Sequence, residues 1–222
     1  MRNYKIIIFN NILLRWLELF FIMVLFPVII IIFNFQKFVI PIIIIASLIS
    51  YFYLKKKHYK FKPLIVIQKK QIKDIFIRFL LICFLTMLFS YLYLSKIFFI
   101  FPYYNFGLWL LFITIYPFIS AFPQELFFRA FFFERYSFLF TNKNYLILTN
   151  GLIFAITHSI YLNFFVLILT FIGGIILAKN YYYNKSIFLV TVEHSLLGNF
   201  IFTIGLGHHF EYSNIKYIYS IL

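Results

Sequence analysis

Long runs of hydrophobic residues, separated by short polar stretches, dominate this chain. The runs lie at about 13–34, 38–54, 75–95, 106–133, 145–161, 163–179 and 186–205. Most reach the ~17–25 residues that an α-helix needs to cross a bilayer. Because lipid forces every backbone polar group to pair within its own segment, the pattern predicts an all-α polytopic transmembrane bundle. We expect about seven spans, with an eighth allowed by the polar C-terminal tail.

The fourth run is longer than one span requires and carries Pro117 and Pro123. Proline removes a backbone donor and kinks or restarts a helix. The run therefore predicts either one bent helix or two stacked pieces.

The charge of the chain follows the apolar runs. The net charge is +14, and the lysines and arginines flank the runs instead of lying on one amphipathic face. Nearly all of them fall on one side of an alternating bundle, which predicts a cytoplasmic N-terminus by the positive-inside rule. The most basic stretch, 55–73, is expected to be a cytoplasmic loop lying on anionic lipid. Nucleic acid is not an expected partner.

Composition excludes a soluble domain. The chain is 64% hydrophobic and only 12% charged, far from the composition of soluble globular proteins. We therefore predict a single integral membrane domain over residues 1–222. The one cysteine, Cys83, excludes an internal disulfide and a thiolate metal cluster.

A few ionisable and amide side chains interrupt three of the last four runs. Glu125 and Arg129 are four residues apart and share one helix face. His158 ends the next run, and the last run carries Glu193, His194 and Asn199. An ionisable group at membrane depth costs about 2.5–3.5 kcal/mol on insertion scales, so such groups usually mark function. We expect a polar site buried between the C-terminal helices.

These residue types suit hydrolysis without a serine or cysteine nucleophile. An acid and a histidine hold and deprotonate a water. A second histidine and an amide stabilise the negative charge on a carbonyl oxygen as it becomes tetrahedral. One glutamate and two histidines also bind zinc in many hydrolases, so the residues alone leave metal-bound and metal-free mechanisms open. No His-Glu-x-x-His helix is present, which excludes a zincin-type site.

Three motifs resemble those of the CPBP intramembrane proteases, the group that contains the CAAX prenyl endopeptidases and their bacterial relatives. They are Gln124-Glu125-x-x-x-Arg129, Phe154-x-x-x-His158 and the segment with His194 and Asn199. The resemblance covers about residues 106–205 as a catalytic core. It implies a peptidase of a prokaryotic cell membrane that acts on a membrane-associated protein or peptide.

The resemblance also implies roles for the residues. The first motif supplies the glutamate that activates water, assisted by His158. His194 and the following amide stabilise the oxyanion, and Arg129 holds the first motif by ion pairing. The mechanism that we favour uses no metal and no other cofactor.

The chain departs from the family pattern at two positions. The motif usually begins with two glutamates, and here Gln124 stands first, so Glu125 has to act as the acid. The family amide usually lies four residues after the histidine, where this chain has Gly198, and Asn199 comes one residue later. Asn199 then needs a π-bulge to reach the site, because one residue turns a helix by about 100°. Glu193 is a candidate substitute acid.

Two alternatives to an active peptidase remain. The first is a catalytically silent relative that acts as a membrane scaffold or immunity protein, and Gln124 is its best argument. The second is a small transporter with a buried proton relay. Transporters of that kind usually contain repeated halves, and no repeat is visible, so we rank the transporter last.

Overall fold

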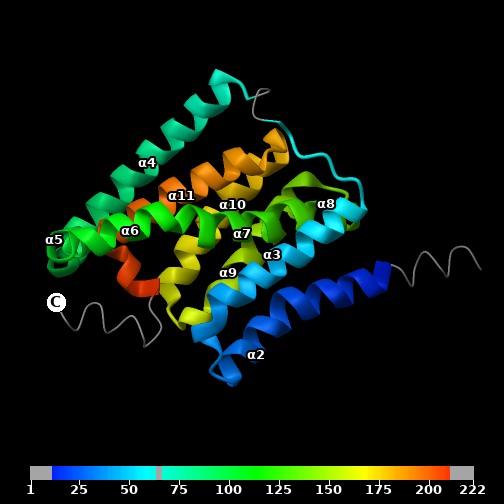
Figure 1. Cartoon of the computed structure of the whole chain (residues 1–222), viewed down its shortest axis with the longest axis horizontal. Coiled ribbons are helices and arrows are strands. Elements are labelled where there is room, and N and C mark those ends of the chain that lie inside the picture. The colour runs from blue at the N-terminus through cyan, green and yellow to red at the C-terminus, as the bar shows by residue number, and fades with distance from the viewer. Residues whose placement is uncertain (1–11, 64–66, 211–222) are drawn as a thin grey trace, which may run out of the picture.

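Helices joined by short turns and loops make up the described structure, a computed structural model that covers residues 12–63 and 67–210. Of the residues in these two ranges, 87% are helical and none is in a strand. Each apolar run coincides with one helix or one row of joined helices, so the prediction of an all-α bundle is confirmed (Figure 1). The basic residues Arg2, Lys5 and Lys216 lie outside the described residues.

The helices follow the runs in chain order. The first comprises Ile12–Ile32 and contains a π-helical segment, η1 (Phe21–Leu25), followed by α2 (Phe26–Ile32). The next elements are α3 (Val39–Lys56), α4 (Lys69–Tyr93), the short α5 (Ile100–Tyr104) and the long element Phe106–Leu139. The last three long helices are α9 (Lys143–Thr157), α10 (Phe164–Asn184) and α11 (Ile187–Thr203).

Five of these helices are long and apolar enough to cross a membrane: Ile12–Ile32, Gln36–Lys56, Lys69–Tyr93, Phe106–Leu139 and Phe164–Asn184. The other two are shorter, with 15 residues in α9 and 17 in α11. α9 falls short of the ~17–25 residues that a helix needs to cross a bilayer, and α11 lies at the lower limit of that range. The two short helices are also the ones that carry the histidine motifs.

The long element of the fourth run is one helix with 34 residues and two π-helical segments. It consists of α6 (Phe106–Tyr116), η5 (Pro117–Ala121), α7 (Phe122–Glu125), η6 (Leu126–Phe131), α8 (Phe132–Tyr136) and η7 (Ser137–Leu139). Of the two predictions for this run, one bent helix is therefore correct and two stacked pieces are wrong. π turns change the phase of a helix and often occur at functional sites. Here they enclose the four residues of α7, which include Gln124 and Glu125.

Glycines let α9 and α10 pack closely. A Cβ on Gly174 would lie 3.0 Å from the Cα of Gly151, and a Cβ on Gly151 would lie 2.9 Å from the backbone nitrogen of Ile175. Small residues at such crossings allow backbones to approach in membranes. The close approach brings the Gly174 carbonyl within 3.5 Å of the Arg129 guanidinium.

A row of hydrogen bonds joins α6 to α11. The indole of Trp109 donates to Thr203 Oγ1 (2.9 Å), and the amide of Asn199 donates to the Ile113 carbonyl (3.0 Å). Proline has no N–H, so Pro117 leaves the Ile113 carbonyl without its α-helical donor. The Asn199 amide supplies the missing donor from the neighbouring helix.

A polar cluster away from these contacts attaches α4 to the last two helices, and Figure 1 shows α4 lying along α11. Arg78 Nε donates to Glu193 Oε1 at 2.7 Å, and Asn180 donates to the other oxygen of that carboxylate. Gln71 donates to Asn184 Oδ1 at 2.8 Å. Every polar atom of the buried Glu193 carboxylate is therefore used to hold helices together.

Candidate active site

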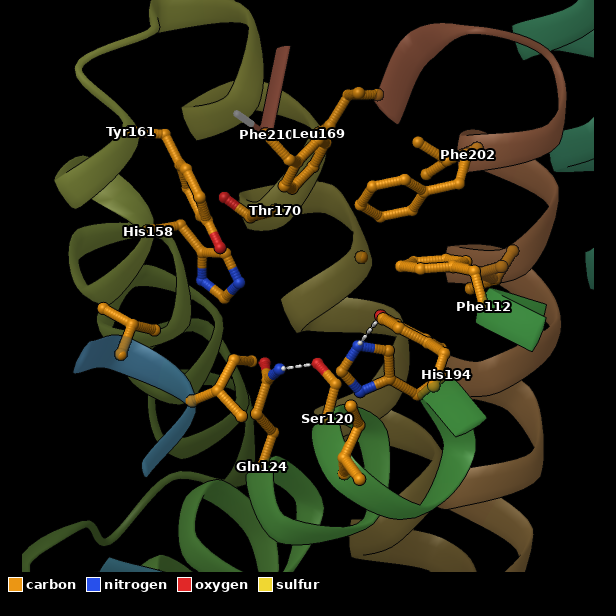
Figure 2. A pocket seen from close by; sticks show the side chains of 18 of the residues that line it. Phe112, Ser120, Gln124, His158, Tyr161, Leu169, Thr170, His194, Phe202 and Phe210 are labelled. Carbon is orange, nitrogen blue, oxygen red and sulfur yellow. Dashed lines mark hydrogen bonds between the residues drawn. The ribbon is translucent and has the colours of Figure 1, made fainter. Parts of the chain in front are cut away.

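A cavity of about 560 Å³ lies between α6, α7, α9 and α11. Two histidines, His158 and His194, line it from opposite walls, as Figure 2 shows. Ser120 and Gln124 lie between them, and aromatic side chains such as Phe202 and Phe210 cover the other side. The cavity is thus mainly apolar, with a few polar groups directed into it, as is usual for a ligand-binding site.

His194 is held from behind by a carboxylate. Its Nδ1 lies 2.7 Å from Glu125 Oε1, while Glu125 Oε2 lies 3.2 Å from Arg129 Nε. Glu125 and Arg129 are both 0% exposed. A carboxylate on one ring nitrogen fixes the orientation and tautomer of an imidazole. His194 therefore presents Nε2 towards the cavity.

His158 is oriented by the backbone. Its Nδ1 lies 2.6 Å from the Phe154 carbonyl, which can only accept, so Nδ1 carries the hydrogen. Nε2 is then the basic nitrogen of the ring. His158 begins the 3₁₀ segment η8 (His158–Tyr161), where α9 ends. A helix end at this point leaves the carbonyl of the preceding turn available to the side chain.

The ring of Phe154 lies against both histidines. Its centroid is 4.5 Å from that of His158 and 5.7 Å from that of His194. The guanidinium carbon of Arg129 lies 4.8 Å from the same ring. One aromatic side chain thus contacts three members of the polar motifs. This explains why a phenylalanine is found four residues before His158.

A polar stripe on the bent helix forms the floor of the cavity. It consists of Tyr116, Ser120 and Gln124, spaced four residues apart. Gln124 Nε2 donates to Ser120 Oγ at 2.9 Å, while the buried Gln124 Oε1 has no partner. The Tyr116 hydroxyl lies 3.1 Å from His194 Nε2. The stripe therefore connects the region of His158 with His194.

The placement of Glu125 differs from the sequence-based expectation. We expected this acid to touch the attacking water, but it does not line the cavity and both its oxygens face Arg129 or His194. The cavity position is occupied by Gln124. Adjacent residues on a helix point about 100° apart, so only one of the two faces the cavity. Glu125 is placed to support His194.

Asn199 and Glu193 also lie away from the cavity. Helix α11 is a regular α-helix without the π-bulge that Asn199 needed to reach the site, and Pro117 offers its amide the carbonyl described above. Glu193 points to α4 and pairs with Arg78. Neither residue lines the cavity, so the amide and substitute-acid roles do not fit their positions.

The donor set does not fit a metal ion. Within the described residues, no group of three or more His, Cys, Asp or Glu side chains is placed to hold one. The carboxylate nearest to the histidines, Glu125, already lies between a guanidinium and an imidazole. A zinc ion would have to displace the Arg129 contact in a fully buried position.

The sequence analysis missed Tyr116 and Ser120. The chain contains 18 tyrosines, so a single one carries no signal. The only indication was the spacing of hydroxyl, hydroxyl and amide at every fourth residue of the Gln124 helix, which places them on one face.

Comparison with known proteins agrees with the motifs. Residues 105–201 match the family model described as type II CAAX prenyl endopeptidase Rce1-like. No curated protein and no solved structure matched the chain. The matched region contains the polar floor, both histidines and Arg129, and its family consists of membrane proteases. The resemblance drawn from the three motifs is therefore confirmed: residues 105–201 of this integral membrane protein match the Rce1-like type II CAAX prenyl endopeptidase family.

Proposed function

We propose that this chain is a membrane-embedded endopeptidase that splits a peptide bond of a membrane-anchored substrate by histidine-assisted attack of water. The observation that carries the proposal is the pair of imidazoles on opposite walls of one cavity, with His194 backed by a fully buried carboxylate. A base within reach of a water, and a second polar wall for the developing charge, are the minimum for amide hydrolysis.

In the proposed reaction His158 Nε2 takes the proton. The water oxygen forms a bond to the peptide carbonyl carbon while its proton moves to His158, and the carbonyl electron pair moves onto oxygen. The oxyanion then collapses, the carbon–nitrogen bond breaks, and His158 returns the proton to the departing amine. The Gln124 carbonyl oxygen, buried without a donor, suits a hydrogen of the attacking water. No metal takes part.

A lipid anchor on the substrate suits the surroundings of the site. A second cavity of about 390 Å³, lined mainly by apolar side chains of the first helix, α3 and η6, shares Gln124 and His158 with the first. An apolar chain in the second cavity would place its attached peptide beside the histidines. The matched family is named for endopeptidases of prenylated CAAX tails, so a prenylated C-terminal peptide is the first substrate class to test.

The test is cleavage of a quenched fluorescent farnesylated peptide by the purified protein in liposomes. We expect His158→Ala and His194→Ala each to lower kcat at least about 100-fold, the usual contribution of a general acid or base. The control is His58→Asn in an exposed loop, because His58 has a φ of 54°, which asparagine tolerates. Equal rates for wild type and both alanine variants would refute the proposal.

One observation favours the silent alternative, namely the Gln124 amide at the cavity position. An amide cannot accept a proton from water at neutral pH. If the wild type were inactive and Gln124→Glu gained activity, the protein would be the scaffold or immunity-like relative. We expect instead a measurable wild-type rate that Gln124→Glu increases.

A further inference from the structure

Tyr116 is the hydrogen-bonding group closest to His194 on the cavity side. Its hydroxyl lies 3.1 Å from His194 Nε2, and the residue lines the cavity. The dashed line at His194 in Figure 2 marks this bond. The ring reaches the cavity from the last residue of α6, where the π-helical segment begins. No other hydroxyl in the described residues is recorded in contact with that nitrogen.

Gly198 provides the space for this hydroxyl. Gly198 lies four residues after His194 on α11 and therefore on the same helix face. A Cβ built on Gly198 would lie 2.4 Å from the Tyr116 hydroxyl oxygen and 2.6 Å from the ring. Real Cβ contacts are never this short, so a side chain at position 198 and the Tyr116 hydroxyl exclude one another. The tyrosine occupies the volume that a side chain of residue 198 would fill.

The nearest amide on α11 is bound elsewhere. Asn199 donates to the Ile113 carbonyl and does not line the cavity. The Tyr116 hydroxyl is therefore the neutral side-chain group in contact with His194, while the Ser120 hydroxyl, which also lines the cavity, accepts from Gln124. Hydrolysis requires donors at the point where the carbonyl oxygen becomes charged.

We propose that Tyr116 is a catalytic residue whose hydroxyl donates a hydrogen bond to the oxyanion. It takes the place of a donor side chain at position 198. This inference rests on the proposed function. The donor that the oxyanion needs is then the Tyr116 hydroxyl. It has room at this position because residue 198 is a glycine.

Two proton arrangements satisfy the contacts of His194. In one, neutral His194 donates from Nδ1 to Glu125 and accepts from Tyr116 at Nε2. In the other, His194 carries both protons, donates to Glu125 and to the Tyr116 oxygen, and leaves the hydroxyl hydrogen free for the cavity. An anion in the cavity favours the second arrangement, because the imidazolium lies beside it. The oxyanion receives its hydrogen bond from Tyr116 in that arrangement, and no covalent bond to Tyr116 forms or breaks.

The first experiment compares Tyr116→Phe with the wild type in the liposome assay. The variant keeps the ring and loses only the hydroxyl, so we expect kcat to fall about 10²–10³-fold, as for removal of one oxyanion donor, with KM little changed. Tyr103→Phe is the control, since Tyr103 is 81% exposed. If Tyr116→Phe cleaves at the wild-type rate while His158→Ala is inactive, the inference is overturned and the proposed function stands.

The second experiment moves the donor to α11. Tyr116→Ala removes the ring and opens the volume in front of position 198, and Gly198→Asn in that background places an amide there. We expect the double variant to exceed Tyr116→Ala in kcat by at least about tenfold. Gly198→Asn alone should unfold at a lower temperature than wild type because of the 2.4 Å contact. No gain in the double variant would contradict the exchange.

A binding measurement separates the donor from turnover. A peptide phosphonate carries a tetrahedral anion at the position of the scissile carbonyl and is not hydrolysed. We expect Tyr116→Phe to bind it about 10–100-fold more weakly than wild type, the usual loss for a hydrogen bond to a charged group. If the wild type is inactive but shows this difference, the peptidase proposal fails and the anion site remains. Equal affinities overturn the inference whatever the activity.

Discussion

Removal of either partner of the buried Glu125–Arg129 pair should destabilise the protein strongly. Both side chains are 0% exposed, and Glu125 Oε2 lies 3.2 Å from Arg129 Nε. The hydrogen bonds of the guanidinium, to the carbonyls of Phe128 and Gly174, are both 3.5 Å long. In Glu125→Leu the guanidinium therefore loses its only carboxylate in an apolar interior.

Breaking a buried ion pair by removing one partner costs about 3–5 kcal/mol. For a chain of this size, that corresponds to a fall of roughly 6–20 °C in Tm. We expect this fall for Glu125→Leu and for Arg129→Met. The double variant should recover most of the loss, since a buried pair replaced by apolar side chains of similar volume is often neutral or stabilising.

Thermal unfolding in detergent, followed by intrinsic fluorescence, measures all three variants against wild type. Lys96→Met is the control, because a surface substitution usually changes stability by less than about 0.5 kcal/mol. The measurement also separates two positions for the acid. If the Glu125 carboxylate lay in the cavity, Glu125→Leu would lower the cleavage rate without lowering Tm. Unchanged Tm in both single variants, or an additive loss in the double variant, would refute the buried pair.

Three further outcomes follow from the packing and the donor set. Gly151→Ala should lower the free energy of unfolding by about 1–3 kcal/mol, the usual cost of overpacking, because its Cβ would lie 2.9 Å from the Ile175 nitrogen. The control is Gly107→Ala, which should leave stability unchanged because a Cβ there has nothing within 4 Å. A similar Tm for both variants would contradict the close crossing of α9 and α10. Glu193→Gln should leave kcat within about twofold while lowering Tm, because Glu193 pairs with Arg78. A large loss of kcat at unchanged Tm would instead indicate that Glu193 takes part in catalysis. A chelator should leave the cleavage rate unchanged and added zinc should not raise it, and restoration of a chelator-inhibited rate by zinc would contradict the metal-free mechanism.

Hydropathy was sufficient to locate the helices. Each apolar run coincides with a helical element to within a few residues, because lipid leaves few alternatives to a helix. Pro117 and Pro123 predicted either one bent helix or two stacked pieces, but not the π turns around α7, since these depend on contacts with other helices. One such contact is the bond from Asn150 to the Phe128 carbonyl (2.8 Å).

The existence of a polar site was easier to predict than the residues that line it. The motifs identified the segments, yet Glu125 was expected at the attacking water and Gln124 faces the cavity instead, because π turns reset the helix phase on both sides. Asn199 was misplaced for a related reason: its partner, the Ile113 carbonyl, is open only because of a proline on another helix. Such pairings over long sequence separations leave no periodic signal.

The bond between Asn199 and Ile113 also has a mechanical consequence. It lies between the Trp109–Thr203 bond and the Tyr116–His194 bond, so α6 and α11 are pinned at three heights along their common seam. Sliding one helix past the other would break all three, at a cost of about 0.6–2 kcal/mol for each hydrogen bond between membrane helices. The three bonds together should therefore keep the spacing between the tyrosine and the imidazole constant while other parts of the bundle move.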